Sequence, residues 1–166
     1  MKKEFDEMTC TIVTAGEELL LKCKNEHEPP YPELKAKFRE LIWKLYCHGY
    51  TDFFVNCEYG IPLWSAEIIC ALKLYNNIGL HIAVPYEEQT TEWAEEKRDR
   101  YFKVHELADS IKLMNTHYHP DCFYEAEKYM TDESDLLLLI GKQGSCSDLF
   151  HYAENKNIHA EYYSIL

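Results

Sequence analysis

Short apolar runs rich in β-branched residues alternate along the chain with longer stretches in which apolar residues recur every three or four positions. Runs of the first kind predict strands, and stretches of the second kind predict amphipathic helices. The predicted strands are 9–14, 53–55, 80–84, 110–114, 136–140 and 158–163. Five helices are predicted. Two have apolar stripes at 34–45 and 64–75, two span about 91–108 and 123–130, and the last starts within 144–148.

The run 136–140 consists of five consecutive apolar residues, which is typical of a strand buried on both faces of a parallel sheet. Strands that alternate with helices in this way predict a mostly parallel sheet of about five or six strands between two helical layers, an α/β/α sandwich. Ser145 and Asp148 have the spacing of a capping box and predict the start of the last helix. Because no repeat or linker interrupts the pattern, we expect one domain over residues 1–166.

Open parallel sheets bind ligands beyond the carboxyl ends of their strands, at the point where the strand order reverses. This rule places any binding site in the loops that follow the predicted strands. These loops are 15–19, 56–63, 85–90, 115–122 and 141–148.

The charge balance narrows the classes of partner. The chain of 166 residues has 17 Lys and Arg against 29 Asp and Glu, a net charge of −12, which argues against general binding to nucleic acids or anionic membranes. No stretch reaches the roughly 20 apolar residues of a membrane span, and the charged amino terminus has no apolar run behind it. The seven cysteines are spread singly along the chain, with no C-x-x-C motif, so we expect free thiols and a cytoplasmic location.

The segment 56–67, NCEYGIPLWSAE, resembles the glycine-rich segment of the SLOG superfamily, and within it the YpsA-like group. The likeness continues at 84–89, 117–123, 129–135 and 144–145, in the same order over nearly the whole chain. It implies a Rossmann-like fold that holds a nucleotide or a derivative such as ADP-ribose or NAD, without naming the cofactor. The residues that it implies as ligand contacts are Gly16, Glu17, Asn56, Glu58, Gly60, Trp64, Glu87, His117, Tyr118, Glu127, Gly144 and Ser145.

The sequence departs from the family pattern at positions that change the charge of this site. The first loop lacks the family's basic residue, and carboxylates stand at Glu17, Glu58 and Glu127. Two unit charges ~5 Å apart repel by about 3 kcal/mol at an effective dielectric near 20. Either the ligand differs from an ordinary nucleotide, a cation bridges the carboxylates, or the site has lost its affinity.

Glu67 is the catalytic candidate, because acidic residues assist N-glycosidic cleavage in the related lonely-guy phosphoribohydrolases. We expect it in the first turn of its helix, where a carboxylate also favours the helix dipole without any catalytic role. Three functions follow: a binder or sensor of a nucleotide-like molecule, an N-glycosidic hydrolase, and an oligomerising scaffold that has lost its ligand.

The remaining chemical features favour structural interpretations. His117, His119 and Cys122 lack a fourth ligand, so we predict no metal site. Cys57 has no evident histidine partner and is expected to be a buried thiol. The stretch 87–89 could reach a ribose or form a solvated turn. Trp64, Trp93 and Tyr101 lie at helical spacing and predict core or interface positions, and the 23 aromatic residues lead us to expect a homodimer.

Overall fold

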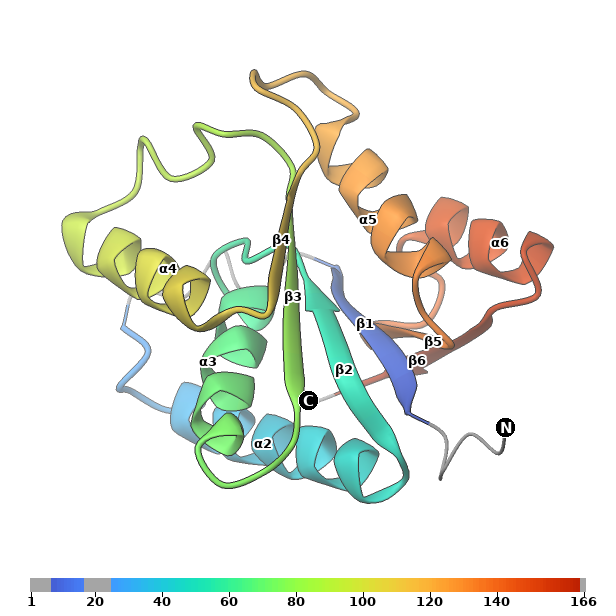
Figure 1. Ribbon diagram of the computed structural model, residues 1–166, viewed down its shortest axis with the longest axis horizontal. Helices are drawn as coiled ribbons and strands as arrows, with labels where there is room; N and C mark the ends of the chain where they lie inside the picture. The colour runs from blue at the N-terminus through green and yellow to red at the C-terminus, as the bar shows by residue number, and fades with distance from the viewer. Residues whose placement is uncertain (1–6, 17–24, 165–166) are drawn as a thin grey trace.

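The computed structural model describes residues 7–16 and 25–164, which form a six-stranded, entirely parallel sheet with the strand order β4-β3-β2-β1-β5-β6 (Figure 1). The strands are β1 (Met8–Ala15), β2 (Tyr50–Val55), β3 (Gly79–Val84), β4 (Ser110–Leu113), β5 (Leu136–Gly141) and β6 (His159–Tyr163). The helices are α2 (Tyr31–Cys47), α3 (Ile61–Lys73), α4 (Glu95–Leu107), α5 (Cys122–Asp132) and α6 (Ser147–Asn155). The predicted Rossmann-like α/β fold is confirmed.

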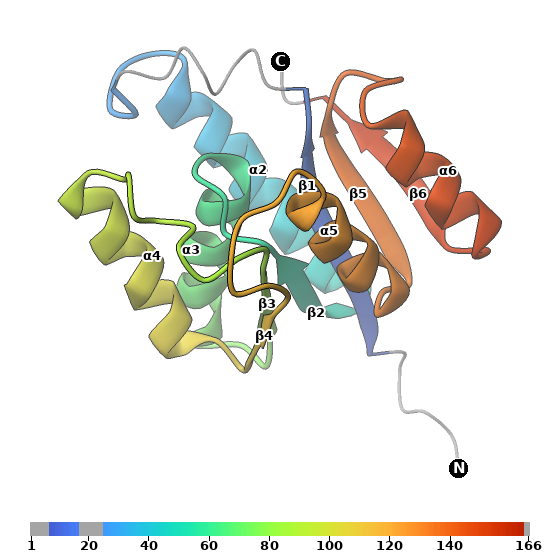
Figure 2. The ribbon, with the colours of Figure 1, turned by 90° about the horizontal axis from the view of Figure 1, so that it is seen from above.

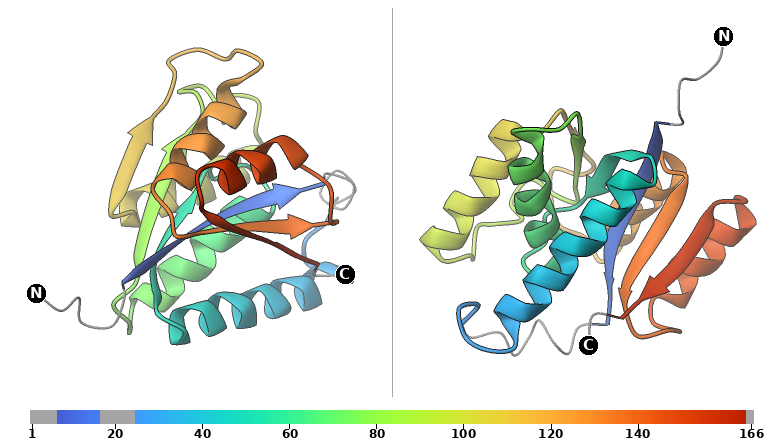
Figure 3. Two further views of the ribbon diagram at one scale, coloured as in Figure 1. Left: turned by 90° about the vertical axis from the view of Figure 1, so that its right-hand side faces the viewer. Right: turned by 90° about the horizontal axis from the view of Figure 1, so that it is seen from below.

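The helices form two layers, one on each face of the sheet (Figures 2 and 3). Side chains of α2, α3 and α4 pack on the face that carries Cys10, Ile12 and Phe53, whereas α5 and α6 pack on the face that carries Val13 and Leu139. The side chains of β5 therefore enter both cores, and its residues 136–140 are all buried. This explains why that strand is apolar throughout instead of alternating.

The strand order reverses between β1 and β5. From β1 the chain adds β2, β3 and β4 outward in one direction, and α5 then returns across the sheet to place β5 on the other side of β1. The two strands pair in register from Cys10 opposite Leu136 to Ala15 opposite Gly141. Their carboxyl ends consequently lie side by side, while the next described helix after each strand, α2 after β1 and α6 after β5, packs on the opposite face from the other.

Two helix starts differ from the prediction. Helix α4 begins at Glu95 instead of about 91, because residues before it form turns in which Trp93 N–H donates to Thr90 O and the Trp93 ring packs against Tyr59 and Tyr101. Helix α6 has Cys146 at its N-cap, and no side chain caps it. The predicted capping box is therefore wrong, because Ser145 lies before the cap in a turn closed by its own N–H to Lys142 O.

None of the helices in the ranges 7–16 and 25–164 is long and apolar enough to cross a membrane. Six cysteines lie in those ranges and carry free thiols, as predicted, and Cys57 is fully buried. Burial raises the pKa of the Cys57 thiol well above its usual value, so this residue stays protonated at neutral pH.

Candidate functional site

The carboxyl ends of β1 and β5 approach each other so closely that only glycine fits. A Cβ added at Gly141 would stand 1.6 Å from Ala15 O, and the φ of Gly141 is +148°. Just beyond, Ser145 Oγ lies 3.5 Å from the place that a Cβ on Gly16 would take. Gly16, directly after β1, thus lies beside the loop after β5 at the reversal of strand order, which is where open parallel sheets place their ligands.

Two helices start at this edge with backbone N–H groups that no side chain caps. Helix α3 follows Gly60, and α6 follows Cys146, which takes the left-handed conformation with φ 55°. Both helix amino termini carry the positive end of the helix dipole. At α6, where residues 146–148 are exposed, the uncapped N–H groups suit an anionic ligand group. At α3, Pro62 has no N–H and Leu63 N–H donates to Glu58 O. Gly144, in the loop before α6, is exposed and a Cβ there would meet nothing within 4 Å.

The loop after β2 is held by a buried amide. Asn56 is buried, its Oδ1 accepts the N–H of Glu58 at 2.9 Å, and its carbonyl oxygen accepts Gln89 Nε2 at 3.2 Å. Gln89 is itself buried and accepts the Tyr101 hydroxyl at 3.2 Å. Gln89 therefore connects the loops after β2 and β3, whereas Glu87 and Glu88 beside it are exposed.

Glu127, in the second turn of α5, is partly buried next to the charge of Glu58. Burial of the carboxyl group and then the Glu58 charge raise the pKa of Glu127 to about 7. At neutral pH a large fraction of Glu127 is thus protonated, and a proton relieves part of the charge repulsion that the sequence predicted. The structure brings two of the three predicted carboxylates together, and the third, Glu17, lies outside the described residues.

The loop after β4 also reaches the carboxyl edge. His117 and Tyr118 are exposed there, and the Tyr118 ring lies 5.3 Å from that of Tyr86. Cys122 is fully buried at the start of α5, and His119 Nε2 lies 3.4 Å from Glu125. Across the part of the chain that the structure describes, no group of three or more His, Cys, Asp or Glu side chains could hold a metal ion.

Two of the predicted site residues, Trp64 and Glu67, lie on α3 toward its neighbours α2 and α4. Trp64 is only 2% exposed, which confirms it as a core residue, and its Nε1 donates to Glu26 at 3.2 Å. Glu67 lies in the second turn of α3, not the first, because Gly60 and Pro62 start the helix at Ile61. Arg100 of α4 binds both Glu67 oxygens, with Nη2–Oε1 at 2.7 Å and Nε–Oε2 at 3.2 Å.

Arg100 also joins Glu67 to a buried carboxylate that sequence reasoning missed. Glu26, which precedes α2, accepts Lys35 Nζ at 2.7 Å and the Tyr59 hydroxyl, and Arg100 Nη1 lies 3.1 Å from it. Burial alone would raise the pKa of Glu26, but the hydrogen bonds and the Arg100 charge outweigh it and lower the pKa to about 2. No local signal marks Glu26, because it stands among polar residues that resemble an ordinary loop.

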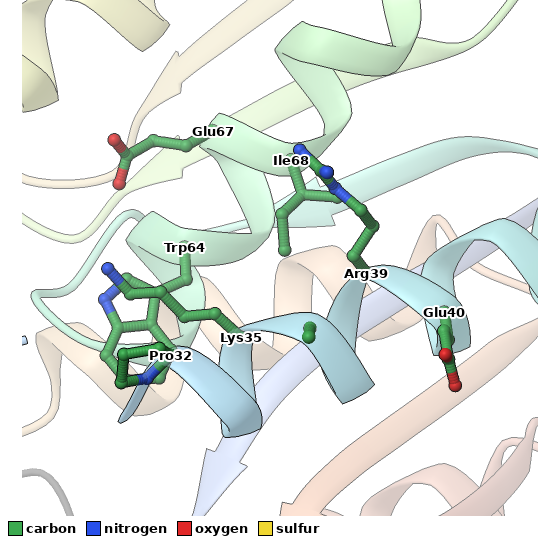
Figure 4. A pocket seen from close by; sticks show the side chains of 8 residues that line it. Pro32, Lys35, Arg39, Glu40, Trp64, Glu67 and Ile68 are labelled. Atoms are coloured by element: carbon green, nitrogen blue, oxygen red, sulfur yellow. The ribbon is translucent and has the colours of Figure 1, made fainter. Parts of the chain in front are cut away.

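Trp64 and Glu67 line a groove of about 540 Å³ between α2 and α3, together with residues of the first half of α2 (Figure 4). This groove lies on the outer surface of the helical layer and not over the carboxyl ends of the strands. The residues predicted to share one site are therefore divided between two places, the sheet edge and this groove.

Comparisons with known proteins agree with the resemblance seen in the sequence. A UPF0398 protein of Staphylococcus haemolyticus is 26% identical over 136 residues, covering 80% of this chain and 73% of the relative. A UPF0398 protein of Staphylococcus aureus is 27% identical over 131 residues, covering 77% and 70%. A solved structure of (E)-4-hydroxy-3-methyl-but-2-enyl diphosphate reductase aligns with 98% of this chain and 65% of that chain at 17% identity. Its TM-score of 0.23 is too low to carry an argument.

The family comparison covers almost the entire chain. Residues 2–165 match the model of the YpsA family, described as the YspA SLOG family. The chain belongs to the YpsA family of SLOG proteins.

Proposed function

We propose that this protein binds a nucleotide-derived small molecule at the carboxyl edge of its sheet, beside Gly16 at the end of β1 and over the loops that follow β2 and β5, and acts as a binding module or sensor. The observation that carries the proposal is the close approach of Gly16 and Ser145 at the reversal of strand order, with the amino termini of α3 and α6 starting at the same edge. Helix α6 begins at exposed residues, and uncapped backbone N–H groups at such a place suit a phosphate.

The carboxylates limit where an anionic group can lie in this site. We place a phosphate group beside the exposed Gly144, in the loop before α6, where it would meet Asp148 in the first turn of that helix. Carboxylates accept hydrogen bonds from ribose hydroxyls in dinucleotide sites, so the uncharged part of the ligand belongs beside Glu58 and Glu127. This arrangement favours ligands with few phosphates over ligands with many.

A thermal-shift panel tests the proposal directly. Adenosine, AMP, ADP, ADP-ribose and NAD are each added to the purified protein, with and without Mg²⁺. A ligand at a hundred times its dissociation constant stabilises by about 2.7 kcal/mol, which raises Tm by roughly 5–10 °C for a domain of this size. A flat panel on well-folded protein would overturn the proposal.

A pair of double variants tests the role of the carboxylates. Glu58→Gln with Glu127→Gln should lower the ratio of the Kd for ADP to the Kd for adenosine at least tenfold, since the repulsion acts on the phosphates. The control, Glu133→Gln with Glu154→Gln, removes the same charge from exposed positions at the ends of α5 and α6, at the opposite edge of the sheet. The control should leave the ratio unchanged, and an equal effect of both doubles would contradict the assignment.

Hydrolysis of an N-glycosidic bond is a second candidate, favoured by one observation. Glu127 has a pKa of about 7 next to a second carboxylate, and paired carboxylates with different ionisation provide a proton donor and an ionised partner. The test is release of free base from nucleosides and nucleoside monophosphates. Loss of release in Glu127→Gln, with full release in Glu67→Gln, supports Glu127 as the proton donor. Retention in Glu127→Gln contradicts it.

A further inference from the structure

The groove between α2 and α3 has the volume of a small-molecule site and lies apart from the carboxyl edge. Its volume of about 540 Å³ lies within the ~300–1,000 Å³ that ligand sites occupy. The apolar part of its lining consists of Pro32 and Ala36 from α2 and Trp64 and Ile68 from α3 (Figure 4). Trp64 is almost fully buried, so a ligand would contact mainly the other three.

Two of the four charged side chains that line the groove, Glu67 and Lys35, are engaged in ion pairs. Both oxygens of Glu67 bind Arg100, and Lys35 Nζ binds Glu26 at 2.7 Å while it lies 4.9 Å from the centre of the Trp64 ring. Glu40 points away from the α3 side of the groove in Figure 4. Glu67 and Lys35 therefore present no uncompensated charge to the interior of the groove.

Arg39 is the exception. Within the ranges 7–16 and 25–164, no carboxylate lies within 4 Å of its guanidinium, in a protein that has far more acidic than basic residues. Its side chain extends from α2 toward Ile68 of α3, so the cation stands beside the apolar lining (Figure 4). A guanidinium next to apolar surface binds a carboxylate through charge-assisted, often bidentate hydrogen bonds.

We propose that this groove binds a small molecule with an apolar body and one anionic group, the anion on Arg39 and the body against Ile68, Ala36 and Pro32. The charge of Arg39 selects the anion, because the carboxylates that could attract a cation are bound to Arg100 or turned away. The apolar lining selects the body, while the ion pair forms at the exposed Arg39. This site does not depend on the nucleotide proposal.

Three probes that share one body test the charge preference by titration of ¹⁵N-labelled protein. They are 4-phenylbutyrate, the uncharged 4-phenylbutan-1-ol and the cationic 4-phenylbutylamine. The carboxylate should bind with a Kd of about 1 mM or tighter and shift the amide signals of residues 36, 39 and 68. It should bind at least tenfold more tightly than the alcohol, and the amine should bind least. Equal binding of the three probes, or no shift at these residues, overturns the proposal.

Substitutions separate the two halves of the groove. Arg39→Gln should weaken 4-phenylbutyrate at least tenfold and leave the alcohol within about twofold, because a charge-assisted hydrogen bond contributes about 1.5–3 kcal/mol. Ala36→Trp, at an exposed helical position, should fill the groove and weaken both probes. The control Lys44→Gln removes a positive charge from the last turn of α2, outside the groove, and should change neither. All three variants should keep the response to the nucleotide panel, so failure of one site is distinguishable from failure of the other. An Arg39→Gln variant that binds 4-phenylbutyrate normally overturns the proposal.

Discussion

Arg100 binds both carboxylate oxygens of Glu67, with Nη2–Oε1 at 2.7 Å and Nε–Oε2 at 3.2 Å. The pair connects α3 with α4 across 33 positions of sequence. It occupies the two oxygens that a catalytic carboxylate would present to a substrate. Glu67 is therefore better explained as part of the ion pairs that hold the outer helical layer together.

Glu67→Gln should leave ligand binding at the carboxyl edge unchanged and lower the free energy of unfolding by at most about 1 kcal/mol, because the Glu67 side chain is 36% exposed. Thermal-shift titration and urea unfolding measure the two quantities. Glu106→Gln, an exposed position on α4, is the control. A complete loss of ligand response in Glu67→Gln would return this residue to the functional site.

Glu26→Gln should destabilise far more, by about 3 kcal/mol and so roughly 6–12 °C in Tm, because it leaves Lys35 and Arg100 without their buried partner. Glu33→Gln, an exposed position in the first turn of α2, should change Tm by no more than about 1 °C. If both variants melt at the same temperature, the buried ion pairs contribute nothing to stability.

The contribution of Glu26 should also depend on pH. Its pKa falls from the usual 4.5 to about 2 on folding, so the stabilisation is complete above pH 4.5 and disappears as the pH falls from there toward 2. Urea unfolding at pH 7, 4 and 3 should show the wild type and Glu26→Gln converging in acid. A constant difference across this range would contradict the lowered pKa.

Glu127 should have the opposite pH dependence. Because folding raises its pKa from 4.5 to about 7, its contribution is fully present below pH 4.5 and is lost as the pH rises through 7. Glu127→Gln should therefore be more stable than the wild type at pH 8, by roughly 2 kcal/mol, and similar to it at pH 4.5. Glu133→Gln is the control. Removal of the neighbouring charge by Glu58→Gln should move the transition to lower pH, and no movement would show that the two carboxylates do not interact.

Gly141→Ala should disrupt the junction of β1 and β5, because the added Cβ would stand 1.6 Å from Ala15 O. The two strands would have to separate at their carboxyl ends, which we expect to cost about 4 kcal/mol or more. Gly144→Ala adds a methyl group to open space at φ +92° and should cost only about 1–2 kcal/mol of backbone strain. Chemical denaturation measures the free energy of unfolding of both variants and so compares a steric clash with backbone strain alone. Similar losses in the two variants would contradict the close approach of Gly141 to Ala15 O.

Much of the fold was predictable because strands and helices have different apolar periods. The five consecutive apolar residues of β5 indicated a strand buried on both faces, and the alternation of elements implied parallel strands. Parallel strands place all their following loops at one edge, so the position of the candidate site was predictable as well. The homodimer expected from the aromatic content stays a prediction.

The details of helix starts were less predictable. Ser145 and Asp148 have a capping-box spacing, yet the chain turns at Lys142 and begins α6 after Cys146. Glu67 was expected in the first turn of its helix, because the apolar stripe of that helix begins at Trp64. Gly60 and Pro62 instead start α3 at Ile61, so Glu67 lies in the second turn. Local spacing alone does not say which of several suitable residues begins a helix, since packing of the preceding turn makes the choice.

The order of the residues determined the elements, their parallel arrangement and the loops at the carboxyl edge, because these depend on periodicity and on connections between neighbouring elements. Only the tertiary structure decided how the charges are partnered. It placed Glu67 and Glu26 on Arg100, brought Glu58 beside Glu127, and left Arg39 without a carboxylate partner among the described residues. These pairings join distant parts of the chain, and their energies depend on burial and distance, which no local pattern of residues records.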